Sequence, residues 1–172
     1  MTQSRHPLRI NVGFLINQPI GTSRDIHFDF PRLNLPPDFE THDFSGVVRV
    51  NRTQQGMILQ GSFKAKKVEQ CVRCLADFLQ PLEASFDELY AFSYRTVGDS
   101  DAEKILPEDS NVELEPLVRE ILLVEVPINP VCKPDCKGLC QDCGADLNAG
   151  PCNCASRGGD PRLAALGKIK LG

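Results

Sequence analysis

The chain has 172 residues, of which 41% are hydrophobic and 24% are charged, and its formal net charge is -4. This length and composition are typical of one globular domain with its own core. No apolar run approaches the roughly 20 residues of a membrane helix, and Met1–Arg9 lacks the apolar centre of a signal peptide. We therefore expect a cytoplasmic protein with no membrane partner. The negative charge disfavours a strong overall attraction to nucleic acid, so RNA binding would require a local basic patch.

The first part of the chain predicts antiparallel strands. The predicted strands are Leu8–Gly13, Asp25–Phe30, Phe44–Val50 and Met57–Ala65. Apolar and polar residues alternate with period two in the first two of them, as half-buried strands require. Pro31, Pro36 and Pro37 predict a loop after the second strand. A five-residue connection that contains a glycine, Arg52–Gly56, predicts a hairpin between the last two.

A strand, an acidic loop and a helix are expected next. The stretch Leu75–Tyr94 predicts at least one long strand that is interrupted near Pro81, and a helix across Ala84–Phe92 is the competing interpretation. Gly98–Glu115 is rich in Asp and Glu and predicts a solvated acidic loop. Glu115–Val126 predicts a helix, because a proline occupies its start and apolar residues recur at spacings of three and four.

Together these segments predict an α+β fold that is mainly antiparallel β, with one amphipathic helix and a cysteine-rich, metal-binding C-terminal segment. We expect a single domain over residues 1–154, which includes the cysteine-rich segment 132–154. Residues 155–172 are expected to form a short C-terminal tail.

The chemistry of the sequence is concentrated in its eight cysteines. Six of them lie between Cys132 and Cys154, and the other two form the pair Cys71-Val-Arg-Cys74. In a reducing compartment, closely spaced cysteines bind metal or perform redox chemistry more often than they form disulfides. The predicted metal ligands are Cys71, Cys74, Cys132, Cys136, Cys140, Cys143, Cys152 and Cys154.

The spacing of the last four cysteines predicts a local site for one zinc ion. Two cysteines separated by two residues can hold an ion from a tight turn, and Gly144 after Cys143 can adopt the positive φ of such a turn. Cys152 and Cys154 follow after a short connection, so the loop costs little entropy to close.

The remaining four cysteines predict a second all-cysteine site. It would join the first cysteine pair to the segment after the helix and make the metal part of the fold. Another partition, in which Cys132, Cys136, Cys140 and Cys143 form one site, is also open at this point. Two zinc ions are the expected cofactors, and all-thiolate ligands do not exclude iron.

The sequence supports a catalytic function less well than structural metal binding. His6, His27 and His42 are scattered and form no metal-binding pair, and the chain has no phosphate-binding loop or nucleophile motif. A thiol oxidoreductase would use Cys71 and Cys74, but the thioredoxin-like motif expects a strand–helix setting that this chain does not predict. All-cysteine ligation favours a structural role over catalysis, so we expect a protein that is not an enzyme.

A cluster of basic residues precedes and enters the first cysteine pair. Its members, and our candidate RNA contacts, are Lys64, Lys66, Lys67 and Arg73. They could form the solvated face of a strand or a patch that contacts phosphates. Direct stacking on single-stranded bases is not supported by a chain with two tyrosines and no tryptophan.

At these residues the chain resembles the YceD family, the large ribosomal RNA subunit accumulation proteins. The resemblance rests on Val68-Glu-Gln-Cys-Val-Arg-Cys-Leu75, on Leu117–Leu123 with the Val-Pro and Val-Cys pairs that follow, on Cys136–Asn148 and on Cys152-Asn-Cys154. The order of these features covers most of the chain.

The resemblance implies a bacterial or plastid factor in ribosome biogenesis, needed for the accumulation or processing of large-subunit ribosomal RNA. It implies ribosomal RNA or a pre-ribosomal large subunit as the partner, and the cysteines as metal ligands, but it supplies no catalytic residues. Two alternatives are a module in which the acidic segment Gly98–Glu115 binds a basic ribosomal protein, and the thiol oxidoreductase described above.

Overall fold

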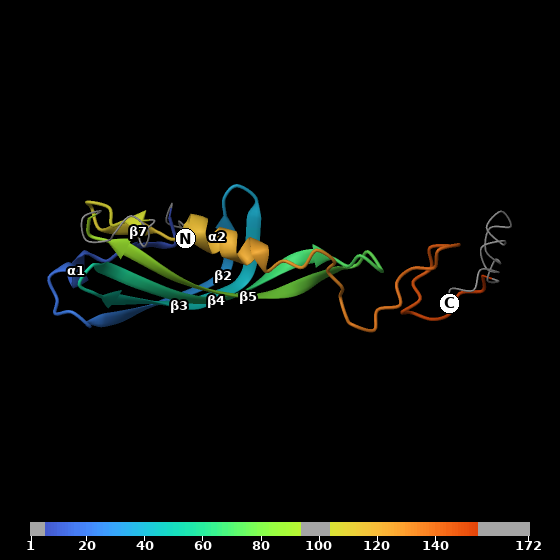
Figure 1. Cartoon of the computed structure of the whole chain (residues 1–172). Helices are drawn as coiled ribbons and strands as arrows, with labels where there is room; N and C mark the ends of the chain where they lie inside the picture. Colours follow the sequence, from blue (N-terminus) through green and yellow to red (C-terminus); the bar gives the residue numbers. More distant parts are fainter. Residues whose placement is uncertain (1–5, 94–103, 155–172) are drawn as a thin grey trace, which may run out of the picture.

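The computed structural model describes residues 6–93 and 104–154. Its main element is a five-stranded sheet in the order β2-β3-β4-β5-β6, beside a two-stranded sheet of β1 and β7 (Figure 1). The strands are β1 (Arg9–Asn11), β2 (Ser23–Leu35), β3 (Phe39–Arg52), β4 (Gly56–Gln70), β5 (Asp77–Ala91), β6 (Lys104–Ile105) and β7 (Asn111–Glu113). The helices are α1 (Gly13–Ile16) and α2 (Glu115–Val124).

The four long strands follow one another along the chain as antiparallel neighbours. β4 and β5 pair over their full length, from Gly56 opposite Ala91 to Gln70 opposite Asp77. Alternate side chains along β4 are buried, as expected for a sheet that has one face on the core. The structure therefore confirms the predicted fold class, a mainly antiparallel β protein with one amphipathic helix and cysteines gathered toward its C-terminal region.

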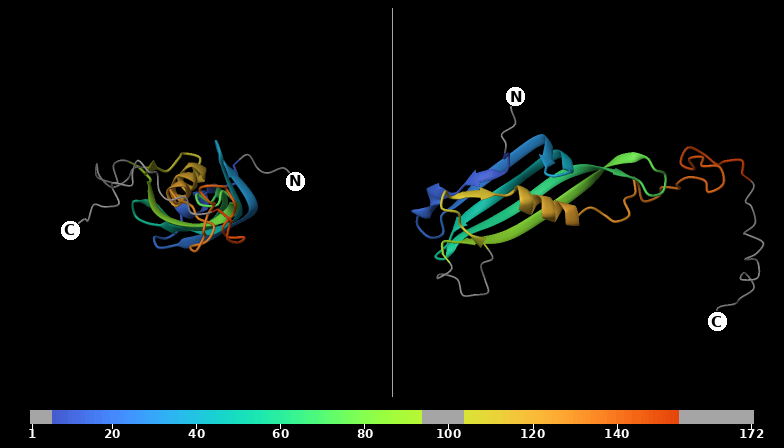
Figure 2. Two further views of the ribbon diagram at one scale, coloured as in Figure 1. Left: turned by 90° about the vertical axis from the view of Figure 1, so that its right-hand side faces the viewer. Right: turned by 90° about the horizontal axis from the view of Figure 1, so that it is seen from above.

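Helix α2 and the small sheet cover the concave face of the curved main sheet (Figure 2). α2 buries Val118 and Leu122 against strands β5 and β2. Aromatic rings line the covered face, where Phe63 stacks between Phe44 and Phe86 with centroid distances of 5.3 and 6.0 Å. The core is thus made by one face of the sheet and one face of the helix.

Two predicted interruptions of strands were wrong. β2 continues through Pro31, and β5 continues through Pro81. A proline has no N–H to donate to a neighbouring strand, and it is therefore tolerated where one side of the strand is unpaired. β2 is the outer strand of the sheet, and β6 pairs only with Tyr90 and Ala91 of β5, so both prolines lie on edges.

The other element boundaries also changed. The competing helix across Ala84–Phe92 is wrong, because Ala84, Phe86 and Tyr90 are buried on one face of a strand. The first predicted strand is shorter and ends at Asn11, and α1 begins at Gly13. The predicted helix is present and ends at Val124, two residues before the expected end.

The acidic segment is not a free loop where the structure describes it. Its residues 104–115 contain β6 and β7, and Val112 and Leu114 are buried in the core. Asp109 accepts hydrogen bonds from Asn111 and forms an ion pair with Arg9 at 2.9 Å, so the polar groups face outward. Residues 98–103 of the segment, and the expected tail at 155–172, lie outside the described residues.

Within the described part of the chain, no helix is long and apolar enough to cross a membrane.

Candidate metal centres

The first cysteine cluster lies where the β4–β5 hairpin meets the chain that leaves α2. Cys71 and Cys74 occupy the turn between the two strands, and Cys132 and Cys136 come from the segment after the helix. The turn is closed by the N–H of Leu75, which donates to the Cys71 carbonyl at 2.9 Å. Leu75 has a φ of 59°, a left-handed conformation that tightens the turn.

The sulfur positions of the first cluster fit a tetrahedral metal ion. The four Sγ atoms all lie within 4.8 Å of one another. Cys71 Sγ is 3.8 Å from Cys136 Sγ, and Cys74 Sγ is 3.7 Å from Cys132 Sγ. A tetrahedron with Zn–S bonds of about 2.3 Å has sulfur–sulfur edges of about 3.8 Å, whereas a disulfide bond is about 2.05 Å long. The four sulfurs could therefore hold one ion, and none of the eight cysteines of the chain forms a disulfide.

Backbone hydrogen bonds hold the C-terminal segment against the hairpin turn. The N–H of Val72 donates to the Pro130 carbonyl at 2.9 Å, and the N–H of Leu139 donates to the Arg73 carbonyl at 3.0 Å. Gly138 has a φ of 74°, and a Cβ there would lie 2.8 Å from the Arg73 carbonyl oxygen. Only glycine accommodates both this conformation and this close approach.

The second cluster is local in sequence. Its four cysteines are Cys140, Cys143, Cys152 and Cys154, whose sulfurs also lie within 4.8 Å of one another. The N–H of Gly144 donates to the Cys140 carbonyl at 2.9 Å, and the φ of Gly144 is 73°, the positive value expected from the sequence. The structure therefore groups the cysteines as two sets of four, and it does not support the partition that combined Cys132 and Cys136 with Cys140 and Cys143.

Asn148 connects the two clusters. Its Oδ1 accepts a hydrogen bond from the N–H of Lys137 at 2.9 Å, and its Nδ2 donates to Cys136 Sγ at 3.5 Å. Asp146 Oδ1 in turn accepts from the Asn148 side chain at 2.8 Å and fixes its orientation. A residue of the second loop therefore contacts a ligand of the first cluster. This role was not predicted from the sequence. Its only signal there was the pair of turn-forming residues Asp146 and Asn148, whose side chains often hydrogen-bond to nearby backbone groups.

The thiols of each cluster differ in acidity. Backbone hydrogen bonds, first that of Cys132, lower the pKa of Cys71 to about 6. Backbone hydrogen bonds, first that of Cys143, lower the pKa of Cys140 to about 7. Burial, followed by the close approach of the Cys74, Cys136 and Cys71 sulfurs, raises the pKa of Cys132 to about 12. Each cluster thus contains one thiol with a lowered pKa and two with a raised pKa. Because a thiol must lose its proton to bind metal, metal affinity should rise with pH.

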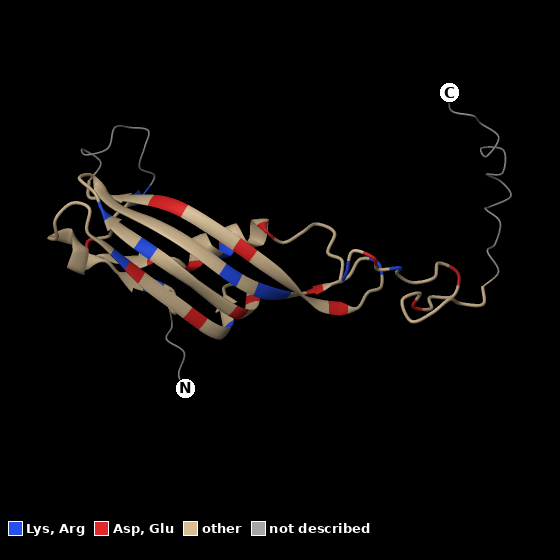
Figure 3. Cartoon of the chain, turned by 90° about the horizontal axis from the view of Figure 1, so that it is seen from below, with Lys and Arg blue, Asp and Glu red and all other residues tan. Residues whose placement is uncertain are grey.

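The four predicted RNA contacts lie on different surfaces. Lys64 and Lys66 point from β4 to the exposed face of the sheet, opposite the core, where cations and carboxylates alternate (Figure 3). Lys67 points to the other face, where its ammonium lies 5.6 Å from the ring centre of Phe39. Arg73 lies in the hairpin turn and donates to the Cys136 carbonyl at 2.9 Å.

Each predicted contact already has a partner within the chain. Lys64 forms an ion pair with Glu83 and Lys66 with Asp43, both at 2.9 Å. Lys67 pairs with Glu69. Both of these ion pairs are exposed to solvent, which weakens them, so an anionic ligand could compete for Lys64 and Lys66. The role of Arg73 in holding the metal-binding segment is a structural one that the sequence did not reveal.

One further group of ligand-type atoms gathers near the start of α2. The three side-chain atoms that could bind a metal here lie within 4.8 Å of one another and belong to His6, Glu113 and Glu115. His6 is 3.5 Å from the Glu113 carboxylate, which Arg9 also contacts at 3.3 Å. Because Arg9 already forms an ion pair with the Glu113 carboxylate, we interpret these three residues as part of a network of surface ion pairs and not as a metal site.

Fold and clusters together define a mainly antiparallel β protein in which two sets of four cysteines could each hold a metal ion. One set fastens the end of a long hairpin to the segment after the helix. The chain belongs to the YceD family, since the family model described as "Large ribosomal RNA subunit accumulation protein YceD" matches residues 59–170.

The chain is also similar to individual proteins. An uncharacterized protein of Mycobacterium tuberculosis is 31% identical over 106 residues, which are 60% of this chain and 51% of that protein. The uncharacterized protein YlbN of Bacillus subtilis is 33% identical over 100 residues, 58% of each chain. The "Large ribosomal RNA subunit accumulation protein YCED homolog 1, chloroplastic" of Arabidopsis thaliana is 31% identical over 64 residues, 37% of this chain and 20% of that one. The chain spans about half the length of the mycobacterial relatives, and no solved structure matches it.

Proposed function

We propose that the chain is a non-enzymatic factor that supports accumulation or processing of large-subunit ribosomal RNA in the cytoplasm, by binding ribosomal RNA or a pre-ribosomal large subunit. Membership of the YceD family carries this proposal, because the family and its plant members take their name from accumulation of that RNA. The two cysteine clusters support a non-enzymatic role, since a catalytic zinc keeps an open position that four thiolates would fill.

Two structural zinc ions belong to the proposal, one in each cluster, and iron is the alternative metal. Sulfur separations of 3.7 and 3.8 Å support a tetrahedral ion in the first cluster. Metal content of the purified protein, measured by native mass spectrometry, should show two ions in the native chain. Cys71→Ser and Cys140→Ser should each retain one. A metal-free native protein would contradict the proposal and would favour the alternative function, a thiol oxidoreductase that uses Cys71 and Cys74.

The proposed RNA contact centres on Lys64 and Lys66, with Lys67 and Arg73 at its margin. The first two share the exposed sheet face and are held only by exposed ion pairs. Their register opposite Glu83 and Pro81 places them near the tip of the β4–β5 hairpin, on the way to the first cysteine cluster. A cluster that fixes this tip would hold the two ammonium groups in a constant orientation toward a phosphate backbone.

Binding of deproteinised large-subunit ribosomal RNA tests this contact. We expect Lys64→Ala with Lys66→Ala to lower affinity several-fold and to reduce the dependence of log affinity on log salt by about 0.7 to 0.9 per lost phosphate contact. Lys67→Ala should be added next. For Arg73 the suitable change is Arg73→Lys, which keeps the positive charge. Replacing Arg73 with alanine would also remove the hydrogen bond to the Cys136 carbonyl and could disturb the cysteine segment.

The matched control replaces two paired cations at the other end of the sheet. Arg9 pairs with Asp109 and Lys104 with Glu88, so the double change of these residues to alanine removes the same charge. It should leave RNA binding unchanged. If the Lys64 and Lys66 variant binds RNA with the native affinity and salt dependence, these lysines are not the contact.

A further inference from the structure

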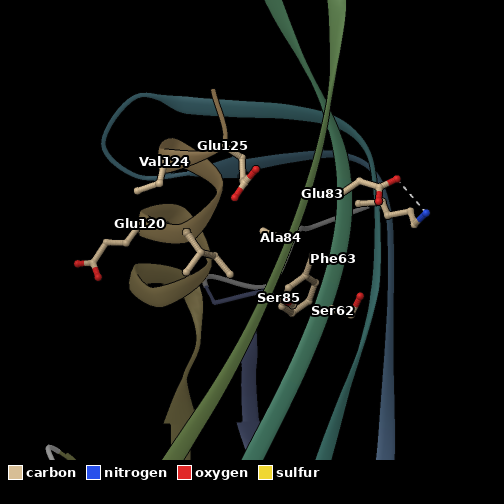
Figure 4. Close-up of a pocket in the computed structure, with 10 residues that line it drawn as sticks. Ser62, Phe63, Glu83, Ala84, Ser85, Glu120, Val124 and Glu125 are labelled. Atoms are coloured by element: carbon tan, nitrogen blue, oxygen red, sulfur yellow. Dashed lines mark hydrogen bonds and ion pairs between the residues drawn. The ribbon is translucent and has the colours of Figure 1, made fainter. Parts of the chain in front are cut away.

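A hollow lies between the C-terminal half of α2 and strands β4 and β5 (Figure 4). It has a volume of about 560 Å³. Phe63 and Ala84 line it from the sheet, and Ile121 and Val124 line it from the helix. This volume falls in the range of pockets that accept a large side chain or a small ligand.

The apolar surface continues beyond the hollow. Val124 is 82% exposed, and Ile128, four residues further along the chain, is 95% exposed. Leu123 beside them is 47% exposed. Single exposed apolar residues are ordinary, but three close together in the sequence, one of which lines an apolar hollow, are typical of a surface that another molecule covers.

The charge around the hollow is negative. Glu120 and Glu125 border it and are exposed, and Figure 4 shows Glu125 directed toward β5 and Glu120 on the outer rim, on the far side of the helix. None of the ion pairs among the described residues involves either glutamate. Glu83, on the strand side, pairs with Lys64, which is the one cation in the lining. The surroundings therefore favour a positively charged occupant over an RNA phosphate backbone.

The hollow also borders an open strand edge. β6 pairs with β5 only at Tyr90 and Ala91, and no other described strand lies beside β5 on that side. Glu83, Ala84 and Ser85 of this edge line the hollow. Alternate residues of such an edge present unpaired N–H and C=O groups, which an extended peptide can use to add a strand.

We propose that the groove between α2 and the β5 edge binds an extended, basic segment of a partner protein, with apolar side chains in the hollow and lysine or arginine opposite Glu120 and Glu125. Strand addition would supply main-chain hydrogen bonds, the hollow would select alternate apolar side chains, and the glutamates would select the charge. Lys64 borders both the hollow and the proposed RNA contact, whereas Glu120, Val124 and Glu125 lie on the helix side only, so changes on the helix side separate protein binding from RNA binding.

The test uses a fluorescently labelled seven-residue peptide that alternates lysine and valine, with the full-length native protein. Fluorescence anisotropy should show saturable binding that weakens with salt. A peptide alternating lysine and serine and one alternating glutamate and valine should each bind at least tenfold more weakly. On binding, amide hydrogen exchange of residues 83–85 should slow, as expected for a strand added at that edge.

Two variants of the groove should lose peptide binding. Glu120→Lys with Glu125→Lys reverses the charge, and Val124→Asp places a carboxylate on the apolar rim, each with an expected loss of tenfold or more. All three positions are exposed, so folding should be preserved. The matched controls are Asp29→Lys with Glu108→Lys for charge and Ile20→Asp for the apolar change, all at exposed sites outside the groove.

Several outcomes would overturn the proposal. Equal binding of the lysine–serine peptide, or native binding by the charge-reversed variant, would mean unspecific attraction of cations. A native dimer that Val124→Asp dissociates would identify a second copy as the occupant. Tighter peptide binding after Lys168→Ser with Lys170→Ser would identify the chain's own basic tail. Ribosomal RNA binding of the Glu120 and Glu125 variant, measured in parallel, should not fall; a fall would assign the groove to RNA.

Discussion

At the residue scale, the Asn148 side chain links the second cysteine loop to the first cysteine cluster. Its amide reaches both the backbone of Lys137 and the sulfur of Cys136, while Asp146 fixes its orientation. A hydrogen bond to a ligand sulfur stabilises the thiolate and orients it toward the ion. The second loop therefore supports the first cluster without supplying one of its ligands.

Asn148→Ala should weaken metal binding in the first cluster by about tenfold or more, the usual cost of losing an outer partner of a ligand. Competition with a chromophoric zinc chelator measures the affinity of each site. Asn148→Asp is the sharper variant, because it keeps an oxygen for the Lys137 N–H but loses the donor to sulfur. Asn34→Ala, at an exposed position of β2, is the control. Native affinity at both sites in both Asn148 variants would refute this role.

At the scale of elements, the edges of the main sheet depart furthest from the sequence-based expectation. The predicted strands 25–30, 44–50 and 57–65 are all present but extend well beyond their alternating cores. Pro31 and Pro81 predicted breaks because a sequence does not reveal whether a strand is central or at an edge. The order of the strands in the sheet decides that, and at an edge the missing N–H costs no ladder hydrogen bond.

Helix α2 has two functions that its sequence pattern only partly distinguishes. Val118 and Leu122 are buried, as the apolar spacing predicts. Val124 is apolar as well but remains largely exposed beside Glu120 and Glu125. The pattern indicates that a helix has an apolar face; it does not show how much of that face the sheet covers.

At the scale of the whole molecule, the hydrophobic core and the two cysteine clusters occupy separate regions. The core cluster extends from Leu8 to Leu122 and contains none of the cysteines. Cys71 and Cys74 lie at the tip of the β4–β5 hairpin, and the other cysteines lie on the C-terminal segment that extends away from the sheet (Figure 1). Metal binding would therefore order the hairpin tip and the segment after the helix rather than the sheet.

Removal of metal by a strong chelator should act on this region alone. Amide hydrogen exchange should accelerate in residues 71–76 and 130–154, while the strands keep their protection and far-UV circular dichroism changes little. Restoring zinc should reverse the change, and Cys71→Ser should mimic it at the hairpin turn. A cooperative loss of the β signal on chelation would show instead that the sheet depends on the metal.

The sequence by itself determined the chemistry and the class of this protein. Cysteine pairs separated by two residues predict turns that could bind metal because their geometry is local, and alternation predicts strands for the same reason. Only the tertiary structure decided that Cys71 and Cys74 meet Cys132 and Cys136, some 60 residues later, because sheet register and the packing of α2 bring those segments together. It also decided which lysines have ion-pair partners and where the groove beside β5 lies, since both depend on contacts between elements far apart in the chain.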